Sequence, residues 1–272
     1  MRKRRSWSAF AAAAFLIVAL SPGLASADGT GKSGPVIRLG QILGVGKMDA
    51  RGCRFDEPIE ITQDMESDES ESKFVALSVS KECRVQVVGT WHGNLADGPA
   101  EVSRELAAVI AGQGRIDPLD DLSSNPDLVP LSTSGCKSIS QTAWMYGFGG
   151  TGDDLTRVAN YTDFCWDAGE VWKTNGGGGC GGSSPLYWTW VRDSCTWPGS
   201  TWGPSRSNIY GTIRGAFHCS PTNVPPCSIG GGYDHQLYAK NTAYPTGSSS
   251  CTYWFTGQIV NGMTHSVVRC SG

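Results

Sequence analysis

The sequence predicts a mainly β protein, in which a small α+β module precedes a C-terminal antiparallel β-sandwich or barrel braced by disulfides. Three observations indicate this fold class. Short apolar and aromatic runs alternate with polar residues and end at turn residues, which is typical of strands. Ten cysteines follow the leader of the chain. Apolar residues recur at helical spacing over more than a couple of turns in one stretch alone.

Residues 1–27 have the three parts of a secretory signal peptide. Arg2–Arg5 form a basic head, Phe10–Leu20 an apolar run and Ala25–Ala27 a small-residue cleavage site. The apolar run is shorter than the roughly 20 residues that cross a bilayer, and no second long apolar stretch follows. We therefore expect a secreted, extracellular protein without a membrane anchor. The arginine pair in the head leaves open whether the general secretory or the twin-arginine route exports it.

Residues 28–111 are expected to form the small α+β module. The runs PIEIT (58–62), FVALSVS (74–80) and CRVQVVG (83–89) alternate apolar and polar residues and predict strands. A proline near the start and a glycine after the end delimit a stretch with apolar residues at helical spacing. One amphipathic helix is therefore predicted over about Pro99–Ala111.

Residues 112–135 contain three prolines among turn residues, which is typical of a linker. Composition changes across this segment, since all eight tyrosines and eight of the ten tryptophans lie at or beyond Trp144. Residues 136–272 are therefore expected to form a separate β module. Its predicted strands are QTAWMYGF, LYWTWV, NIYGTIRGAF, HQLYAK and CTYWFTGQIV, and the glycine-rich stretches NGGGGCGGSSP and IGGGYD between them predict loops.

Ten cysteines in an exported chain predict five disulfides. The first module holds only Cys53 and Cys83, which must pair with each other if that module folds alone. The sequence leaves open how the other eight pair: Cys136, Cys165, Cys180, Cys195, Cys219, Cys227, Cys251 and Cys270. A metal site would need close pairs such as C-x-x-C, which this spacing does not provide. We expect no metal and no other cofactor.

The charge of the chain disfavours nucleic acid as a partner. Four of the 22 basic residues belong to the leader, which leaves 18 basic and 25 acidic residues and a net charge of −7. Binding phosphates requires a basic field. The charge is uneven, because residues 28–135 carry 10 basic and 18 acidic groups, whereas residues 136–272 carry 8 and 7.

No sequence motif identifies a reaction. The G-x-S-x-G setting of a serine nucleophile does not occur, and a free Cys165 nucleophile would leave another cysteine unpaired. A carboxylate pair for glycoside hydrolysis could come from Asp163, Asp167, Glu170, Asp193 and Asp234, but spacing along the chain does not give their separation in space. We expect a non-catalytic protein and keep a hydrolase as the alternative.

The basic head KRRSW, the alanine-rich leader and the run DFCWDAGEVW (163–172) resemble uncharacterised secreted proteins of actinobacteria. The resemblance covers the leader and parts of the second module. It implies export from a Gram-positive cell and no particular activity.

Four tryptophans crowd the stretch LYWTWVRDSCTWPGSTWGP (186–204). Alternation puts Trp188 and Trp190 on one face of a strand, which is the better candidate for the core. Trp197 and Trp202 lie beside Pro and Gly residues of turns, where rings are less easily buried. These two could stack on a sugar or another partner, or could lie back over the core.

Asn261-Gly262 near the C-terminus lies between two alternating runs and predicts a β-hairpin with a two-residue turn. In that register Trp254 faces Arg269 and Gln258 faces His265, and these four residues form an outer row that could bind a sugar. An ordinary solvated face with a Trp–Arg contact is the alternative. The opposite face should pack inward, and it carries Tyr253, Phe255, Ile259, Val268 and Cys270.

The sequence thus favours a secreted, non-catalytic binding protein that presents aromatic side chains to a glycan or another cell-envelope surface. Two alternatives remain. One is a secreted hydrolase of wall or environmental polymers, and the other is an exported inhibitor or toxin that acts on a surface protein.

Overall fold

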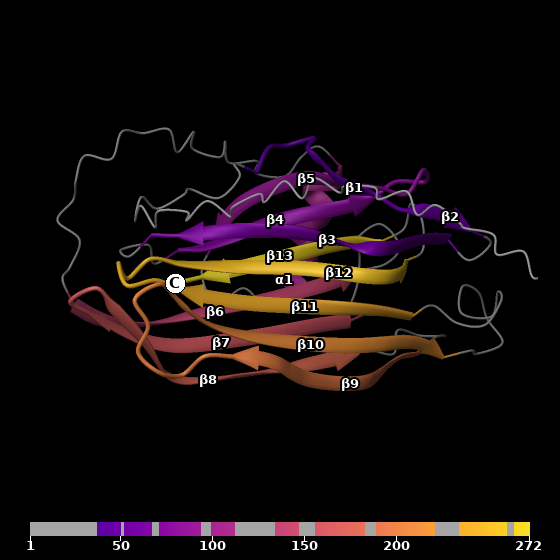
Figure 1. Ribbon diagram of the computed structural model, residues 1–272. Coiled ribbons are helices and arrows are strands. Elements are labelled where there is room, and N and C mark those ends of the chain that lie inside the picture. The colour runs from indigo at the N-terminus through magenta and orange to yellow at the C-terminus, as the bar shows by residue number, and fades with distance from the viewer. Residues whose placement is uncertain are drawn as a thin grey trace, which may run out of the picture. The chain divides into compact units, whose positions relative to one another are not determined.

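Two antiparallel β-sheets packed face to face make up the described part of the chain (Figure 1). The computed structural model describes residues 37–49, 52–66, 71–93, 99–111, 134–146, 156–182, 189–220, 234–259 and 264–272. The predicted signal peptide and most of the predicted linker lie outside these residues. The mainly β, disulfide-braced fold class is confirmed. No helix among the described residues has the length and apolar character needed to cross a membrane.

The first sheet, called sheet A, has seven strands. In spatial order they are β1 (Ile42–Val45), β5 (Arg84–Gly93), β4 (Ser72–Val79), β13 (His265–Ser271), β6 (Ser134–Tyr146), β7 (Thr156–Asp167) and β8 (Glu170–Gly182). The second, called sheet B, has six: β2 (Lys47–Asp49), β3 (Gly52–Met65), β12 (Ser249–Ile259), β11 (Asp234–Ala243), β10 (Ile209–Ser220) and β9 (Thr189–Ser200). The helix α1 (Pro99–Ile110) lies where its apolar spacing predicts it.

The structure corrects the expectation of two separate modules, residues 28–111 and 136–272. Strand β3 pairs with β12 in sheet B, and β4 pairs with β13 in sheet A. Residues 33–272 accordingly form one compact unit. The physical reason is that β3 and β4 would each expose an edge of unpaired backbone groups without these C-terminal strands. Composition changes along the chain, but the hydrogen-bond ladders cross that boundary.

The glycine-rich stretch at residues 175–182 is also corrected, because it belongs to strand β8 and not to a loop. Its backbone pairs with β7 from Asn160↔Gly178 to Thr156↔Gly182. A Cβ atom at Gly178 would overlap the carbonyl oxygen of Ala159, so this position requires glycine. Close approach to the neighbouring strand, rather than loop conformation, explains glycine here.

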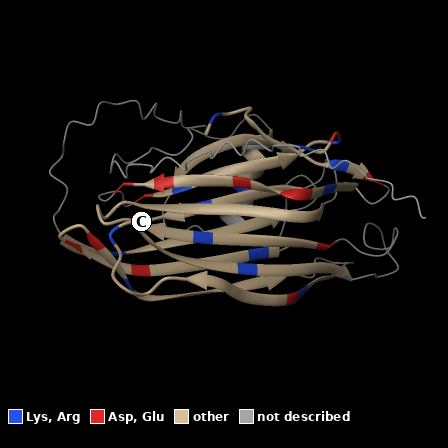
Figure 2. Ribbon diagram, viewed as in Figure 1, with Lys and Arg blue, Asp and Glu red and all other residues tan. Residues whose placement is uncertain are grey.

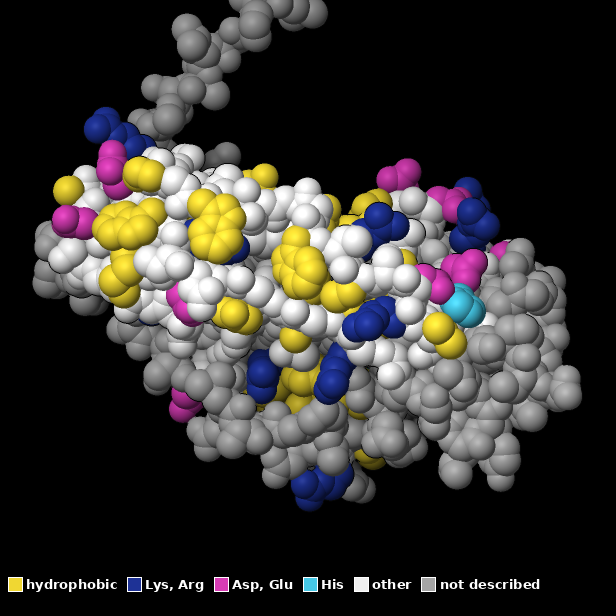
Figure 3. Space-filling model, turned by 90° about the horizontal axis from the view of Figure 1, so that it is seen from below, with side chains coloured by type: hydrophobic (Ala, Val, Ile, Leu, Met, Phe, Trp, Pro, Cys, Tyr) yellow, Lys and Arg dark blue, Asp and Glu magenta, His cyan; other side chains and the backbone are white. Residues whose placement is uncertain are grey.

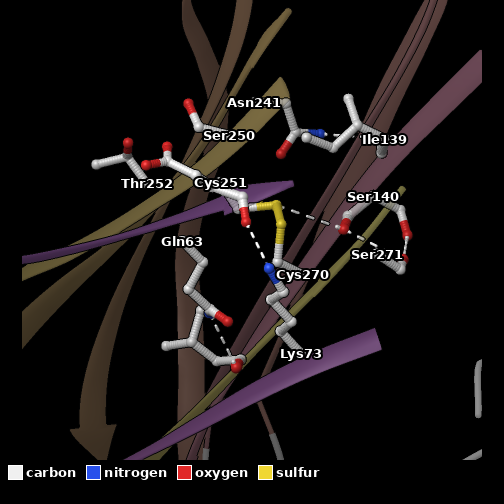
Figure 4. The surroundings of a disulfide bond; sticks show 12 residues. Gln63, Lys73, Ile139, Ser140, Asn241, Ser250, Cys251, Thr252, Cys270 and Ser271 are labelled. Carbon is white, nitrogen blue, oxygen red and sulfur yellow. Dashed lines mark hydrogen bonds between the residues drawn. A yellow bond between two sulfur atoms is a disulfide. The ribbon is translucent and has the colours of Figure 1, made fainter. Parts of the chain in front are cut away.

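Disulfides join the two sheets at three places. Cys53 of β3 bonds to Cys83 before β5, Cys180 of β8 to Cys195 of β9, and Cys251 of β12 to Cys270 of β13 (Figure 4). A fourth bond, Cys136–Cys165, joins the neighbouring strands β6 and β7. Cys219 is also disulfide-bonded, and Cys227 lies outside the described residues. The predicted Cys53–Cys83 bond is confirmed, and the bonds indicate an oxidising environment.

Amide side chains also cross between the sheets, and sequence reasoning did not anticipate them. Asn160 of sheet A donates from Nδ2 to the carbonyl oxygens of Gly211 at 2.7 Å and Ala239 at 3.1 Å, both in sheet B. Asn241 of sheet B donates to Ile139 at 3.2 Å and to the backbone oxygen of Asn160 at 3.1 Å. Because buried polar groups need partners, these bonds set the relative position of the sheets more specifically than apolar packing alone.

The helix α1 covers the outer face of sheet A over β4, β5, β6 and β13. Val102 and Leu106 of the helix are buried there. They belong to one apolar cluster with side chains of β4, β5, β6 and β13, namely Phe74, Ala76, Trp91, Trp144, Tyr146 and Val267. This second core lies outside the sandwich.

Candidate ligand-binding face

The predicted hairpin register between β12 and β13 is wrong. Trp254 pairs with Tyr238 and Glu60 in sheet B, whereas Arg269 pairs with Phe74 and Thr142 in sheet A. The reason is that β12 and β13 each have two other neighbours and enter different sheets. The expected turn itself, Asn261-Gly262, lies outside the described residues.

The inward face of these strands was predicted correctly, since alternation does not depend on the neighbouring strand. The residues in question are all buried: Tyr253, Phe255, Ile259, Val268 and Cys270. The outward row, by contrast, is divided between the two sheets. Trp254 lies on the outer face of sheet B. Arg269 and His265 lie on sheet A, with the Arg269 guanidinium 5.5 Å from the centre of the Trp144 ring.

Gln258 and His265 are both buried and are not brought together. Gln258 donates from Nε2 to Asp49 Oδ1 at 2.7 Å. His265 pairs with Ser78 and Tyr146, and burial lowers its pKa to about 4, so the ring is neutral at pH 7. Neither residue belongs to an open ligand site with Trp254.

Trp254 instead belongs to a row that runs across sheet B. Arg214, Tyr238 and Trp254 stand opposite one another on β10, β11 and β12. The Tyr238 and Trp254 rings stack with their centres 4.8 Å apart and their planes at 10°. The Arg214 guanidinium lies 5.8 Å from the Tyr238 ring centre. The row ends at Glu60 on β3.

The next two rows of the same face are rich in hydroxyl groups. Thr212, Lys240, Thr252 and Thr62 face one another in register, and Thr62 and Thr252 share a hydrogen bond of 3.1 Å between their hydroxyls. Lys240 Nζ lies 5.0 Å from the centre of the Tyr210 ring. Beyond it, Tyr210 pairs with Thr242 and Thr242 with Ser250. The outer face of sheet B therefore alternates rings, cations and hydroxyls.

Trp197 and Trp202 lie at the β9 edge of this face. Trp197 belongs to β9 itself rather than to a turn, and Trp202 follows it; their exposed fractions are 54% and 53%. Trp202 donates from Nε1 to Ser200 Oγ at 3.0 Å. Thr201, its neighbour, hydrogen-bonds to Tyr210 from backbone and side chain. Figure 3, seen from the side of β8 and β9, shows hydrophobic side chains exposed there with basic side chains beside them.

The cations of this region have no acidic partner among the residues that the structure describes. Exposed cations elsewhere do, as in the Lys47–Asp56 and Arg206–Glu170 pairs. Arg214 and Lys240 lie against rings, and among the described residues the Arg214 Nε is buried without a hydrogen-bond partner. Lys173 of β8 likewise lies with Nζ 4.3 Å from the centre of the Trp202 ring, and burial lowers its pKa.

We call the aromatic face two adjoining sets of residues that combine these rings and cations. Tyr210, Arg214, Tyr238, Lys240 and Trp254 point outward from β10–β12. Trp197 and Trp202 lie at the adjoining β9 edge, where Trp202 is beside Ser200 and Lys173 of sheet A. Sequence reasoning identified its three tryptophans and missed the rest. A signal was present, because alternation places Tyr210 and Arg214 on one face of NIYGTIRGAF, and Tyr238 and Lys240 on one face of HQLYAK. Only strand order shows that these faces adjoin.

A pocket of about 470 Å³ lies at the other end of β10 and β11. Asp193, His218 and Asp234 line it, and His218 Nδ1 is 2.5 Å from Asp193 Oδ1. His235, also in the lining, is fully buried with a pKa lowered to about 3 by burial, so it stays neutral. Of the five carboxylates considered from the sequence, these two aspartates are the ones that this pocket brings together.

Asp163 and Glu170 are engaged elsewhere. Asp163 accepts a hydrogen bond from Ser138, and Glu170 pairs with Arg206. Within the described ranges, no group of three His, Cys, Asp or Glu residues has the arrangement of a metal site.

The aromatic face can therefore stack rings on a ligand and bind anionic groups through two cations, whereas the hydroxyls of Thr212, Thr242 and Ser250 between the rings are buried. The geometry comes from the register of four adjacent strands, which presents side chains of every second residue to one side. Comparisons with protein-family models, with curated proteins and with solved structures find no match to this chain.

Proposed function

We propose that this protein is a secreted, non-catalytic glycan-binding protein that holds a polysaccharide against the aromatic face. The observation that carries the proposal is the pair of half-exposed tryptophans, Trp197 and Trp202, beside a row of outward rings and cations. Tryptophan combines a large apolar surface with a polar N–H, which suits contacts where one side is wet. Two such rings left open on one edge support a binding role.

The neighbouring polar groups favour a sugar over a protein partner. Protein interfaces have an apolar core from which charged residues are depleted. Here the rings alternate with two cations and with the half-buried hydroxyl of Thr252, while Thr212 and Thr242 of the same rows are buried. A sugar offers both an apolar ring face and many hydroxyl groups, so it complements this pattern. The disulfides between the sheets support function outside the cell.

The test is retention of the mature chain on insoluble polysaccharides, including cell-wall material. The double variant Trp197→Ala/Trp202→Ala should lose most of the retention, because both open ring faces are gone. Tyr161→Ala is the matched control, since Tyr161 is an exposed aromatic residue on β7 of sheet A. Equal retention of all three proteins, or of none, would contradict the proposal; binding to a surface protein instead would favour the inhibitor hypothesis.

The pocket supports a second candidate function, hydrolysis of a wall or environmental polymer. Two carboxylates beside a histidine are groups that general acid–base catalysis uses. Asp193 and Asp234 line the same pocket as His218. Release of soluble sugars from a polysaccharide panel, abolished in both Asp193→Asn and Asp234→Asn, would support this function; no release by the native chain would reject it.

A further inference from the structure

The aromatic face carries positive charge that no acidic side chain of the described residues neutralises. Arg214 and Lys240 lie on the middle strands β10 and β11 of sheet B (Figure 2). Neither makes an ion pair within 4 Å, and both lie against rings. The full chain, by contrast, carries a net negative charge. A cluster of unpaired cations on an acidic protein is a local feature of this face.

The two cations are neighbours by register. Arg214 stands opposite Tyr238, and Lys240 is two residues further along the same strand. Diagonal neighbours of this kind have their Cα atoms about 7–8 Å apart. The Arg214 guanidinium lies over Tyr238 and the Lys240 ammonium over Tyr210, so the two cations serve neighbouring rows of the face. Lys173 of sheet A lies beside the Trp202 ring but is only 9% exposed, so it is not counted among the cations open to a ligand.

Acidic side chains near the face lie at its borders. Glu60 and Asp64 are on β3, beyond Trp254. Asp193 and Asp234 line the pocket at the far end of β10 and β11. An anionic ligand is therefore attracted to β9–β11 and repelled on either side. The distribution of charge therefore predicts where the ligand binds. It would lie across β9, β10 and β11, between the exposed tryptophans and Tyr238.

We propose that the ligand is an acidic polysaccharide, whose carboxylate or sulfate groups bind Arg214 and Lys240 while its sugar rings stack on Trp197 and Trp202. This inference rests on the proposed function and adds the chemical class of the glycan. A guanidinium binds carboxylate or sulfate oxygens through paired N–H groups, which strengthens such contacts over neutral hydrogen bonds. Single-stranded nucleic acid offers rings and anions too, but its dense phosphates need a more extended basic surface than two cations on an acidic chain.

The experiment is affinity electrophoresis of the mature chain in gels that contain one polymer each. Polygalacturonate should retard the protein, the same polymer with its carboxyl groups methyl-esterified should retard it far less, and raising the salt concentration should weaken retardation. A sulfated polymer such as chondroitin sulfate distinguishes the source of the anion: stronger retardation there assigns sulfate, and weaker retardation assigns carboxylate. A neutral β-glucan is the uncharged reference.

The double variant Arg214→Gln/Lys240→Gln should weaken binding of the acidic polymer by about tenfold or more, as expected for losing charged hydrogen bonds. The control Arg38→Gln/Arg84→Gln changes net charge equally at exposed positions near β1 and should leave binding unchanged. Near-UV circular dichroism checks that both variants fold.

Three outcomes overturn the inference in distinguishable ways. If the neutral glucan binds equally well, and Trp202→Ala weakens it while the double charge variant does not, the proposed function stands and the acidic ligand is rejected. If no polysaccharide retards the protein, both fail. If oligo-dT binds more tightly than polygalacturonate with the same dependence on Arg214 and Lys240, the partner is nucleic acid.

Discussion

The outer faces of the two sheets use the same side chains in opposite ways. On sheet A, Phe74 stacks on Trp91 with ring centres 5.2 Å apart, and Arg269 lies over Trp144. On sheet B, Tyr238 stacks on Trp254 and Arg214 lies over Tyr238. Yet Trp91 and Trp144 are 5% and 3% exposed, because they lie in the cluster that includes Val102 and Leu106 of α1. An aromatic row is core or surface according to what covers it.

The difference has a physical basis. Covering sheet A removes a large apolar area from water, which stabilises the fold by roughly 25 cal/mol per Å². Sheet B has no such cover among the described elements, and its rings alternate with polar groups that keep it hydrated. Its rings therefore stay partly exposed, whereas those under α1 are buried.

Reduction of the disulfides should have the largest effect, and it should affect both faces at once. Three of the bonds join sheet A to sheet B, and removing native disulfides from a secreted domain typically costs about 2–5 kcal/mol each. Near-UV and far-UV circular dichroism, followed during titration with a phosphine reductant, should change together. Loss of the near-UV signal with the 222 nm signal of α1 intact would show that the helix-covered face folds independently.

Truncating one tryptophan on each face should separate core from surface. Trp91→Ala removes a ring packed under α1 and should lower the free energy of unfolding by about 3–5 kcal/mol. Trp202→Ala removes a half-exposed ring and should cost less than about 1 kcal/mol. Urea denaturation measures both. Similar losses for the two variants would mean that Trp202 is a structural residue and would weaken the binding proposal.

Acid should destabilise the protein through two buried histidines, His265 of sheet A and His235 of sheet B. His265 is buried with its pKa lowered to about 4, below the unfolded value of 6.5. Between these values the unfolded chain takes up a proton that the folded chain does not, so stability falls as pH falls, by at most about 1.4 kcal/mol per pH unit from this residue.

The buried His235 of sheet B, with a pKa of about 3, adds a slope of the same sign. Urea denaturation between pH 7 and pH 4.5 should show the decline, and His265→Gln should reduce its slope. An unchanged slope in that variant would assign the acid sensitivity to other groups.

The smallest effect is expected from exchanging the two arginines. Arg269→Lys should cost about 1 kcal/mol, because the Arg269 guanidinium lies over the buried Trp144 ring and also donates to Thr142 Oγ1 at 3.4 Å. Arg214→Lys keeps its charge on the more open face and should cost about half of that or less. Thermal denaturation compares the two. A larger loss for Arg214→Lys would indicate that the Arg214–Tyr238 contact holds sheet B together.

Much of the fold could be predicted from residue patterns. Alternation in PIEIT and FVALSVS placed β3 and β4, and the spacing of Val102 and Leu106 placed α1. The pairing of Cys53 with Cys83 followed from elimination, and it is correct even though the separate module assumed for it is not. The glycine run of β8 was wrongly predicted to be a loop. The backbone entropy of glycine favours a loop, but here glycine is present because the neighbouring strand approaches too closely for a side chain.

The candidate site was predictable only in part. Trp197, Trp202 and Trp254 stand out as exposed or outward rings from local context. Arg269 and His265 were placed beside Trp254 because an Asn-Gly turn favours a hairpin. That assumption failed when β12 and β13 entered different sheets, and Tyr238 and Arg214 took the neighbouring positions instead.

Residue patterns alone predict most of the strands, the buried side of each of those strands and the presence of disulfides. These properties depend on a period of two along one strand and on residue chemistry, both of which are local. The tertiary structure decided which strands are neighbours, which outer face α1 covers and hence which rings remain open. Those outcomes depend on backbone pairing and on burial between segments far apart in the chain. Alternation along one strand does not identify the strand that pairs with it.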